Sequence, residues 1–263
     1  MESMLKIGKV EKRIYEIREK HPLVIPQIDP DKQSLDEAVK MLKKLDSYGV
    51  EHLAIGSSLI DPVSTQALFD VILNDFDFTF TTYISNTSSF LLKGKVGRSS
   101  IYWATVFNAS NLFYLRDSLI MGAPLIKTEF LEPIPTAYVF DERNSKGTAN
   151  WLAQANPIPQ NKPEISLATA LACQYLGVRF YIMAGGSGSF LPPPESHVRL
   201  LRDKTDLFLL PTSGIKSHAH VKALLDAGAD ALHVGSMIET KEGLAEFEKI
   251  FSSSKKYPGR KVI

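Results

Sequence analysis

Three turns made of glycine and hydroxyl residues each follow a short apolar stretch in the last third of the chain. They span residues 185–189, 213–214 and 235–236, and we refer to them as the glycine turns. Turns of this composition leave backbone N–H groups pointing outward, where they can hold an anion. The last turn contains no Lys or Arg, so binding there would depend on N–H dipoles and hydroxyl groups. This pattern predicts a site for a phosphorylated small molecule.

A carboxylate and a hydroxyl group offer a second kind of chemistry nearer the amino terminus. Asp29 follows the apolar stretch 23–28, and Ser58 follows the apolar stretch 52–55. If these stretches are neighbouring parallel strands, the two side chains lie side by side, and their oxygens suit Mg²⁺, which takes few protein ligands. The alternative is that Asp29 caps the next helix and that Ser58 only serves a tight loop.

Aromatic side chains gather in the middle third of the chain. Packing in the core or at an interface explains most of them. The alternative is an apolar groove for a long hydrophobic substrate, leading away from the glycine turns. The residues are Tyr83, Phe90, Tyr102, Trp103, Phe107, Phe113, Tyr114 and Phe130.

Several other chemistries are disfavoured by what the sequence lacks. The six histidines have no metal-ligand spacing apart from His218 and His220, which begin a predicted helix and are expected to face solvent. The chain has no nucleophile elbow, no Walker loop and no evident Ser-His-Asp set. Nothing in it points to acyl transfer or covalent catalysis.

Short apolar strands alternate with amphipathic helices along the chain, which is the pattern of a parallel α/β sheet. Eight repeats in 263 residues favour one closed (β/α)₈ TIM barrel, because about 250 residues is typical of that fold. The predicted strands are residues 23–28, 52–55, 78–83, 100–107, 136–140, 179–183, 206–210 and 229–234. The predicted helices are a leading helix within residues 1–20 and residues 35–48, 63–73, 112–121, 165–176, 195–202, 218–227 and 241–251.

Three segments depart from this regular alternation. Residues 84–97 are rich in Ser, Asn and Gly, so an irregular segment is expected in place of the third helix. Residues 124–129 look extended, in addition to the strand at 136–140. Residues 141–163 are polar and contain three prolines, which predicts a long loop with one helical turn near Trp151.

Composition bounds the class of protein. Hydrophobic residues make up 44% of the chain, which is enough for the ordinary core of a single domain of residues 1–263. The net charge is +1, so no strong positive electrostatic field attracts nucleic acid. The single Cys173 lies in an apolar helical run and is expected to be a core thiol in a reducing compartment. No signal peptide is evident, and no apolar run reaches the ~20 residues of a membrane span. We expect a cytoplasmic protein.

The sequence resembles geranylgeranylglyceryl phosphate synthases and their heptaprenyl-transferring bacterial relatives. The resemblance runs from about His21 to Glu239, nearly the whole chain. Its anchors, in the family's order, are Gln27-Ile-Asp-Pro-Asp-Lys32, Ile55-Gly-Ser-Ser58, Asn108, the Tyr138 segment, Tyr181-Ile-Met-Ala-Gly-Gly-Ser-Gly188, Thr212-Ser-Gly-Ile-Lys-Ser217 and Gly228-Ala-Asp with Val234-Gly-Ser236.

This resemblance implies transfer of a prenyl group, expected to be geranylgeranyl, from a prenyl diphosphate to the C3 hydroxyl of sn-glycerol 1-phosphate. It implies Mg²⁺ as cofactor, held by Asp29 and Ser58, and catalytic roles for Asp29 and Tyr181. A homo-oligomer and transient contact with a membrane that holds the lipid substrate are also expected. The residues expected to bind substrate are Tyr181, Ile182, Met183, Ala184, Gly185, Gly186, Ser187, Gly188, Ser213, Gly214, Gly235 and Ser236.

The chain departs from the family's pattern in the sixth strand. The family usually has a Glu where this chain has Met183, two residues after Tyr181, and a thioether cannot accept a proton from a hydroxyl. The following turn also has one extra glycine. Either Glu129 or Glu132 replaces the acid, or the phosphorylated acceptor differs, or the barrel binds phosphate without catalysis. An isomerase or aldolase of sugar phosphates is a further alternative, with Lys127 as its candidate for a Schiff base.

Overall fold

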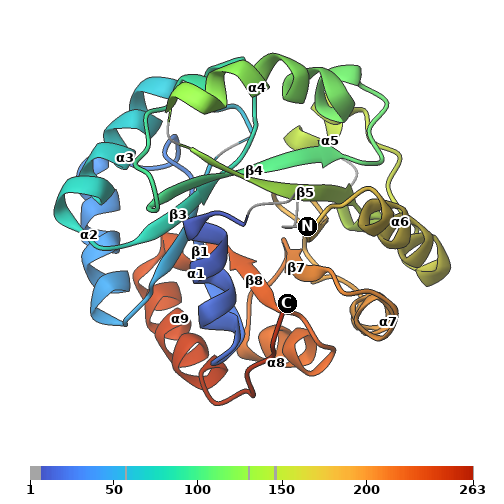
Figure 1. Cartoon of the computed structure of the whole chain (residues 1–263). Helices are drawn as coiled ribbons and strands as arrows, with labels where there is room; N and C mark the ends of the chain where they lie inside the picture. The colour runs from blue at the N-terminus through green and yellow to red at the C-terminus, as the bar shows by residue number, and fades with distance from the viewer. Residues whose placement is uncertain (1–6, 57, 130, 145–146, 263) are drawn as a thin grey trace.

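Eight parallel strands form a closed barrel in chain order, with helices around it (Figure 1). The computed structural model describes residues 7–56, 58–129, 131–144 and 147–262. Each strand pairs in parallel with its neighbours, and β1 pairs with β8 to close the ring. The predicted (β/α)₈ TIM barrel is confirmed.

The strands lie close to their predicted positions, apart from β5, which begins earlier. They are β1 (Leu23–Ile28), β2 (His52–Ile55), β3 (Thr79–Thr82), β4 (Ser99–Val106), β5 (Glu132–Phe140), β6 (Phe180–Ala184), β7 (Phe208–Thr212) and β8 (Ala231–Val234). Helices cover the outer face of most strands and the barrel interior covers the other face, which is why these stretches read as short continuous apolar runs.

The helices follow the predicted alternation. They are α1 (Lys9–Arg18), α2 (Leu35–Ser47), α3 (Pro62–Asp75), α4 (Ser118–Glu129), α5 (Thr148–Ala153), α6 (Pro163–Tyr175), α7 (Glu195–Lys204), α8 (His218–Asp226) and α9 (Lys241–Ser254). Short 3₁₀ helices are η1 (Thr87–Leu91), η3 (Glu142–Asn144) and η4 (Ser236–Glu239), and η2 (Phe113–Asp117) is a π-helical turn. No helix in the described part of the chain is long and apolar enough to cross a membrane.

The two predicted irregular segments agree with the structure. Within residues 84–97 the only helical element described is the five-residue η1, and α5 forms the helical turn expected near Trp151. The leading helix begins at Lys9, and the first six residues of its predicted span lie outside the described residues.

The prediction that residues 124–129 are extended is wrong. They form the second half of α4, which continues from η2 without a break and contains Pro124. A proline has no N–H and disfavours the interior of a helix, which is why the local pattern pointed to a strand. Packing outweighs this preference, because Gly122 lies against the ring of Phe90 and Ile126 is buried.

Local signals fix several helix ends. The hydroxyl of Ser34 accepts the backbone N–H of Glu37, and the Glu37 carboxylate accepts the backbone N–H of Ser34, which together form a capping box at the start of α2. Asp61 caps α3 through two backbone N–H groups. Gly49 ends α2 with a φ of 76°, a conformation that only glycine adopts without strain.

Side chains on the strands alternate between the barrel interior and the outer face, which packs against the helices. The ring of Phe180 on β6 lies 6.4 Å from the ring of Tyr102 on β4. Because β4 and β6 are not neighbours, these two rings meet inside the barrel. The residues next to them in sequence therefore point outward.

The amino-terminal end of the barrel is covered by α1 (Figure 1). The ring of Tyr15 packs against the rings of Phe180 and Phe208. The carboxylate of Glu132, at the start of β5, accepts two backbone N–H groups in the first turn of α1, at 2.8 and 2.9 Å. A residue distant in sequence thus caps this helix, because Gly8 at its N-cap position has no side chain to do so.

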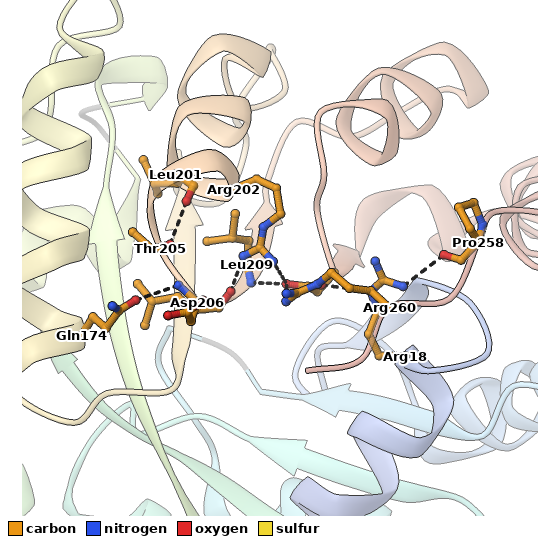
Figure 2. A network of polar contacts seen from close by, with 11 residues as sticks. Arg18, Gln174, Leu201, Arg202, Thr205, Asp206, Leu209, Pro258 and Arg260 are labelled. Atoms are coloured by element: carbon orange, nitrogen blue, oxygen red, sulfur yellow. Dashed lines mark hydrogen bonds and ion pairs between the residues drawn. The ribbon is translucent and has the colours of Figure 1, made fainter. Parts of the chain in front are cut away.

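The side chains of Arg18, Arg202 and Arg260 come together at the same end (Figure 2). All three donate to the carboxylate of Asp230. The side chain of Asp230, just before β8, is fully buried. Nε of Arg18 and Nε of Arg260 donate to its Oδ1 at 3.0 and 2.9 Å, and Nη1 of Arg202 donates to Oδ2 at 3.3 Å. Oδ2 also accepts the N–H of Leu209 on β7. One carboxylate therefore ties α1, α7 and the carboxyl-terminal tail to the barrel.

Candidate active site

Asp29 lies directly after β1 at the carboxyl-terminal end of the barrel, where barrel enzymes carry their active sites. Its side chain is 13% exposed, and Oδ2 is 2.6 Å from Nζ of Lys32. Oδ1 accepts the side-chain amide of Gln27 at 3.2 Å. Burial raises the pKa of the Asp29 carboxyl above its ordinary value, and the contact with Lys32 opposes that shift. A partly shielded carboxylate thus stands at the barrel mouth beside one cation.

A magnesium ion fits these residues if a substrate supplies most of its ligands. Among the described residues, no group of three or more His, Cys, Asp or Glu could hold a metal. The half-buried Ser58 follows β2, which is the neighbour of β1. One carboxylate and one hydroxyl suit an ion that takes its remaining oxygens from a diphosphate and water. Lys32 would then share the Asp29 carboxylate with the ion.

A hydrogen-bonded chain inside the barrel lies beneath Asp29. Nδ1 of His233 on β8 is 2.5 Å from the hydroxyl of Tyr83, and Nε2 is 2.9 Å from the hydroxyl of Tyr102. The Tyr83 hydroxyl is also 3.4 Å from Oε1 of Gln27, whose amide reaches Asp29. Burial lowers the pKa of the His233 ring to about 3, so the ring is neutral at pH 7. Asp29 is thus connected to the centre of the barrel.

Tyr83 is the last residue of the predicted strand 78–83, and no role was predicted for His233. A signal was present in the alternation of β8, since Ala231 faces the interior and His233 two residues later must do the same. The partners of His233 are Tyr83, directly after β3, and Tyr102 of β4, across the barrel. Only closure of the sheet brings them together.

The glycine turns follow β6, β7 and β8, as predicted. After β6, Gly185 and Gly186 are buried, while Ser187 and Gly188 are exposed. Because these three strands are consecutive in the barrel, the three turns lie on one side of the mouth.

The turn after β7 has positive φ angles, and the turn after β8 has free space around its glycine. Ser213 has a φ of 69°, which is rare for a residue with a Cβ, and Gly214 has a φ of 70°. Gly235 is half-buried and has room around its Cα. Ser236 is exposed and begins η4. Strain of this kind often marks a functional turn.

The side chains of Tyr181 and Met183 do not face the mouth, which contradicts the substrate contacts predicted for them. Because Phe180 points into the barrel, Tyr181 points outward, into the core between the sheet and the helices near Cys173 of α6. Its buried hydroxyl has no hydrogen-bond partner among the described residues. Met183 belongs to the same outer core. The Tyr181 hydroxyl therefore does not lie where the predicted catalytic role needs it.

The inward positions of β6 near the mouth are Ile182 and Ala184, both fully buried. If the alignment with the family is shifted by one residue, Ile182 takes the position of the family's Tyr and Ala184 that of its Glu. This alignment no longer needs an extra glycine in the following turn. Sequence comparison alone favoured the identical Tyr181, whereas the pleat of the strand decides which residues face inward. β6 consequently supplies neither a hydroxyl nor an acid to the interior.

Neither proposed replacement acid stands at the mouth. Glu132 begins β5 at the opposite end of the barrel and caps α1. Glu129 belongs to the last turn of α4, which leads to that same end. Lys127 lies in the same helical turn and not at the end of a strand, so the isomerase or aldolase alternative loses its candidate for a Schiff base.

The carboxyl-terminal half of β4 is partly exposed on both faces, whereas β2, β3, β6, β7 and β8 are buried throughout. Trp103 points outward, toward Phe90 of η1 at a ring distance of 6.1 Å, and Ala104 points inward. Phe90 and Tyr102 are core residues, and Phe130 lies outside the described residues. The half-buried members of the predicted aromatic set are Tyr83, Trp103, Phe107, Phe113 and Tyr114.

A groove of about 910 Å³ lies between α2 and α9 and reaches the end of β1. Gln27, Asp29 and Lys32 line it near the mouth, and Tyr48 and Glu248 line it farther down the side of the barrel. The sequence did not predict this groove, because the two helices that form it are nearly the whole chain apart.

Comparisons with known proteins identify the family of this chain. A model described as the PcrB family matches residues 15–253. Geranylgeranylglyceryl phosphate synthase of Pyrococcus horikoshii is 35% identical over 247 residues, which cover 93% of this chain and 94% of the relative. The enzyme of the same name from Pyrococcus furiosus is 33% identical over 250 residues, covering 93% and 96%.

A solved structure shares the fold. (S)-3-O-geranylgeranylglyceryl phosphate synthase of Thermoplasma acidophilum, in complex with its substrate sn-glycerol-1-phosphate, has a TM-score of 0.85 and 24% identity over 95% of this chain and all of that chain. The family match covers most of the sequence, the curated relatives match end to end, and the resemblance predicted from the sequence is confirmed. This chain belongs to the PcrB family.

Proposed function

We propose that this chain transfers a prenyl group of the geranylgeranyl type from a prenyl diphosphate to the C3 hydroxyl of sn-glycerol 1-phosphate, with Mg²⁺. Prenyl transfer in ether-lipid synthesis is the activity that the names of the curated relatives give. The identities of the acceptor and of the metal ion are proposed from the residues at the barrel mouth.

The observation that carries the proposal is the position of Asp29 relative to the glycine turns. Asp29 follows β1, and the turns follow β6, β7 and β8, so a carboxylate for a metal and N–H groups for a phosphate meet at one barrel mouth. A reaction between a diphosphate and a phosphorylated alcohol needs these two kinds of site next to each other.

The reaction requires the protein mainly to stabilise the leaving diphosphate and to position the acceptor hydroxyl. The bond between the allylic carbon and the diphosphate oxygen breaks, and the C3 oxygen of the acceptor forms the new bond to that carbon. Mg²⁺ held by Asp29 and Ser58 would stabilise the leaving diphosphate. Lys32, 2.6 Å from Asp29, is placed to add a second positive charge. Since the interior positions of β6 (Phe180, Ile182 and Ala184) carry no acid, the released diphosphate is proposed to take the hydroxyl proton.

The prenyl tail is proposed to lie beside β4. The partly exposed half of β4 is next to the irregular segment around η1, where other repeats of the barrel have a full helix. Half-buried aromatic side chains there offer apolar surface to an isoprenoid chain. A homo-oligomer and transient contact with a membrane remain proposals.

One assay tests the proposal directly. Purified protein is incubated with Mg²⁺, radiolabelled sn-glycerol 1-phosphate and prenyl diphosphates of several lengths, and label is counted in the lipid-soluble phase. We expect a labelled prenyl ether with at least one donor. Label that stays in water with every donor would overturn the proposal. A parallel arm with other phosphorylated three-carbon acceptors identifies a changed acceptor, which the apolar Ile182 and Ala184 make worth testing.

A further inference from the structure

We propose that Arg143 is a positioning residue that aims two backbone N–H groups of the glycine turn at residues 213–214 toward the phosphate of the acceptor. This inference rests on the proposed function, since it explains how the turn after β7 becomes an anion site. Arg143 lies in η3, within the long connection after β5, and no feature of the sequence had singled it out.

All five N–H donors of the Arg143 guanidinium have partners. Nε and one N–H of Nη2 donate to the two carboxylate oxygens of Asp141, at 2.5 and 2.8 Å. Nη1 donates to the backbone oxygens of Leu191 and Ser213, both at 2.9 Å. The other N–H of Nη2 donates to the backbone oxygen of Thr212 at 3.1 Å. The Arg143 side chain is fully buried, so it cannot also bind a ligand itself.

The direction of two N–H groups follows from these contacts. No described peptide bond is cis, and in a trans peptide the C=O and the N–H point in opposite directions. Because the oxygen of Thr212 points at Arg143, the N–H of Ser213 points away from it. Because the oxygen of Ser213 also points at Arg143, the N–H of Gly214 points away as well.

The side opposite Arg143 is the one open to a ligand. A Cβ built on Gly185 would lie 3.0 Å from the central carbon of the guanidinium, so Arg143 is enclosed beneath the turn after β6. Ser213 and Gly214 keep partial exposure. Their N–H groups therefore face the mouth, where the phosphate is proposed to bind.

Arg143 also holds a conformation that the chain would not adopt alone. Ser213 has a φ of 69°, which a residue with a Cβ disfavours. A Cβ on Gly214 would lie 1.9 Å from the backbone oxygen of Leu191, an oxygen that Arg143 itself binds. The ion pair with Asp141 neutralises the buried positive charge of Arg143.

Arg98 provides a matched control at the other end of the barrel. Its guanidinium likewise donates to backbone oxygens, those of Phe76 and Phe78 at 2.6 and 2.7 Å. It is far in the fold from the glycine turns, because it precedes β4. Arg98→Lys therefore reports the general effect of weakening an arginine that binds backbone.

The test measures binding of sn-glycerol 1-phosphate by calorimetry to the wild type, Arg143→Lys and Arg98→Lys. A lysine keeps the charge beside Asp141 but cannot reach three carbonyl oxygens at once. We expect Arg143→Lys to weaken acceptor binding about tenfold or more, as for the loss of well-aimed N–H donors to an anion. The KM of the prenyl diphosphate stays within about twofold, and Arg98→Lys changes neither value. Amide hydrogen exchange at residues 213–215, measured with sn-glycerol 1-phosphate present, becomes faster in Arg143→Lys alone.

The outcomes are distinct. If the wild type binds no glycerol phosphate, the proposed function fails and this inference with it. If the wild type binds it and folded Arg143→Lys binds equally well, the proposed function stands and the inference is overturned. Should Arg143→Lys not fold, the uncharged pair Asp141→Asn with Arg143→Gln takes its place, with the same loss expected and the same retention contradicting the role of Arg143.

Discussion

The hydroxyl of Tyr83 lies 2.5 Å from Nδ1 of His233, across the barrel interior from β3 to β8. Tyr102 satisfies the second ring nitrogen, so the buried imidazole has both of its hydrogen bonds. Polar groups in a packed core need such partners. The same hydroxyl reaches Gln27, so the arrangement stabilises the barrel and supports the residue that contacts Asp29.

Tyr83→Phe is expected to lower the free energy of unfolding by about 1–3 kcal/mol, because it leaves a buried ring nitrogen of His233 without a partner. Urea unfolding followed by circular dichroism measures the change. Tyr175→Phe, at a side chain that is 79% exposed, is the control and stays within about 0.5 kcal/mol of the wild type. Equal stability of the two variants would contradict the importance of the contact.

The stability of the protein is expected to fall as the pH drops below about 6.5. Burial lowers the pKa of both His52 and His233 from 6.5 to about 3. Between these values the unfolded chain binds a proton at each ring and the folded chain does not, so protons favour unfolding. The slope reaches up to about 1.4 kcal/mol per pH unit for each ring, and above pH 6.5 this contribution no longer changes.

Urea unfolding at pH 7, 6, 5 and 4 measures this slope. His218→Gln is the control, because it removes an exposed histidine instead of a buried one. His233→Leu removes one of the two buried rings and so reduces the change in the free energy of unfolding per pH unit by the contribution of that ring. A free energy of unfolding that stays constant from pH 7 to pH 4 would show that the buried rings are protonated in the folded state.

Asp29→Asn is expected to lower kcat/KM by about 100-fold or more while the fold is retained, because the amide keeps the shape but cannot neutralise a metal ion. Product formation is measured against Mg²⁺ concentration. Asp36→Asn, at an exposed carboxylate in the first turn of α2, is the matched control and keeps full activity. Activity of Asp29→Asn at the wild-type level would place the metal elsewhere.

Tyr181→Phe is expected to keep full activity, which separates the structure from the prediction made on sequence alone. The hydroxyl that it removes is buried outside the barrel and has no described partner, so stability is equal to the wild type or greater by up to about 1 kcal/mol. Steady-state kinetics and urea unfolding measure the two effects. A tenfold loss of kcat with stability unchanged would restore a catalytic role for this tyrosine.

Asp230→Asn is expected to destabilise the fold by about 3–5 kcal/mol, because it leaves the guanidinium groups of Arg18, Arg202 and Arg260 without the carboxylate between them (Figure 2). Thermal and urea unfolding measure the loss. Asp206→Asn, at an exposed carboxylate nearby, changes stability by less than about 0.5 kcal/mol. A small effect at Asp230 would mean that the arginines repel one another little without it.

Much of the fold could be predicted because its signals are local. The capping box at Ser34 and Glu37 joins residues three apart, and short apolar runs separated by amphipathic helices indicate parallel strands. The glycine turns and Asp29 were found because each follows such a run directly. The rule that parallel strands end on one edge then places them together.

The tertiary structure decided which direction each side chain faces and which residues it contacts. The outward direction of Tyr181 depends on the pleat of β6, and a shift of one residue, invisible in the sequence, reverses it. Residues distant in sequence needed the closed barrel to meet: Glu132 with the start of α1, Tyr83 with His233, and Arg143 with the turn after β7. The sequence by itself determined the barrel, its mouth and the family, because these follow from periodicity and short motifs. Contacts across the barrel and between its loops depend on closure, which no local pattern encodes.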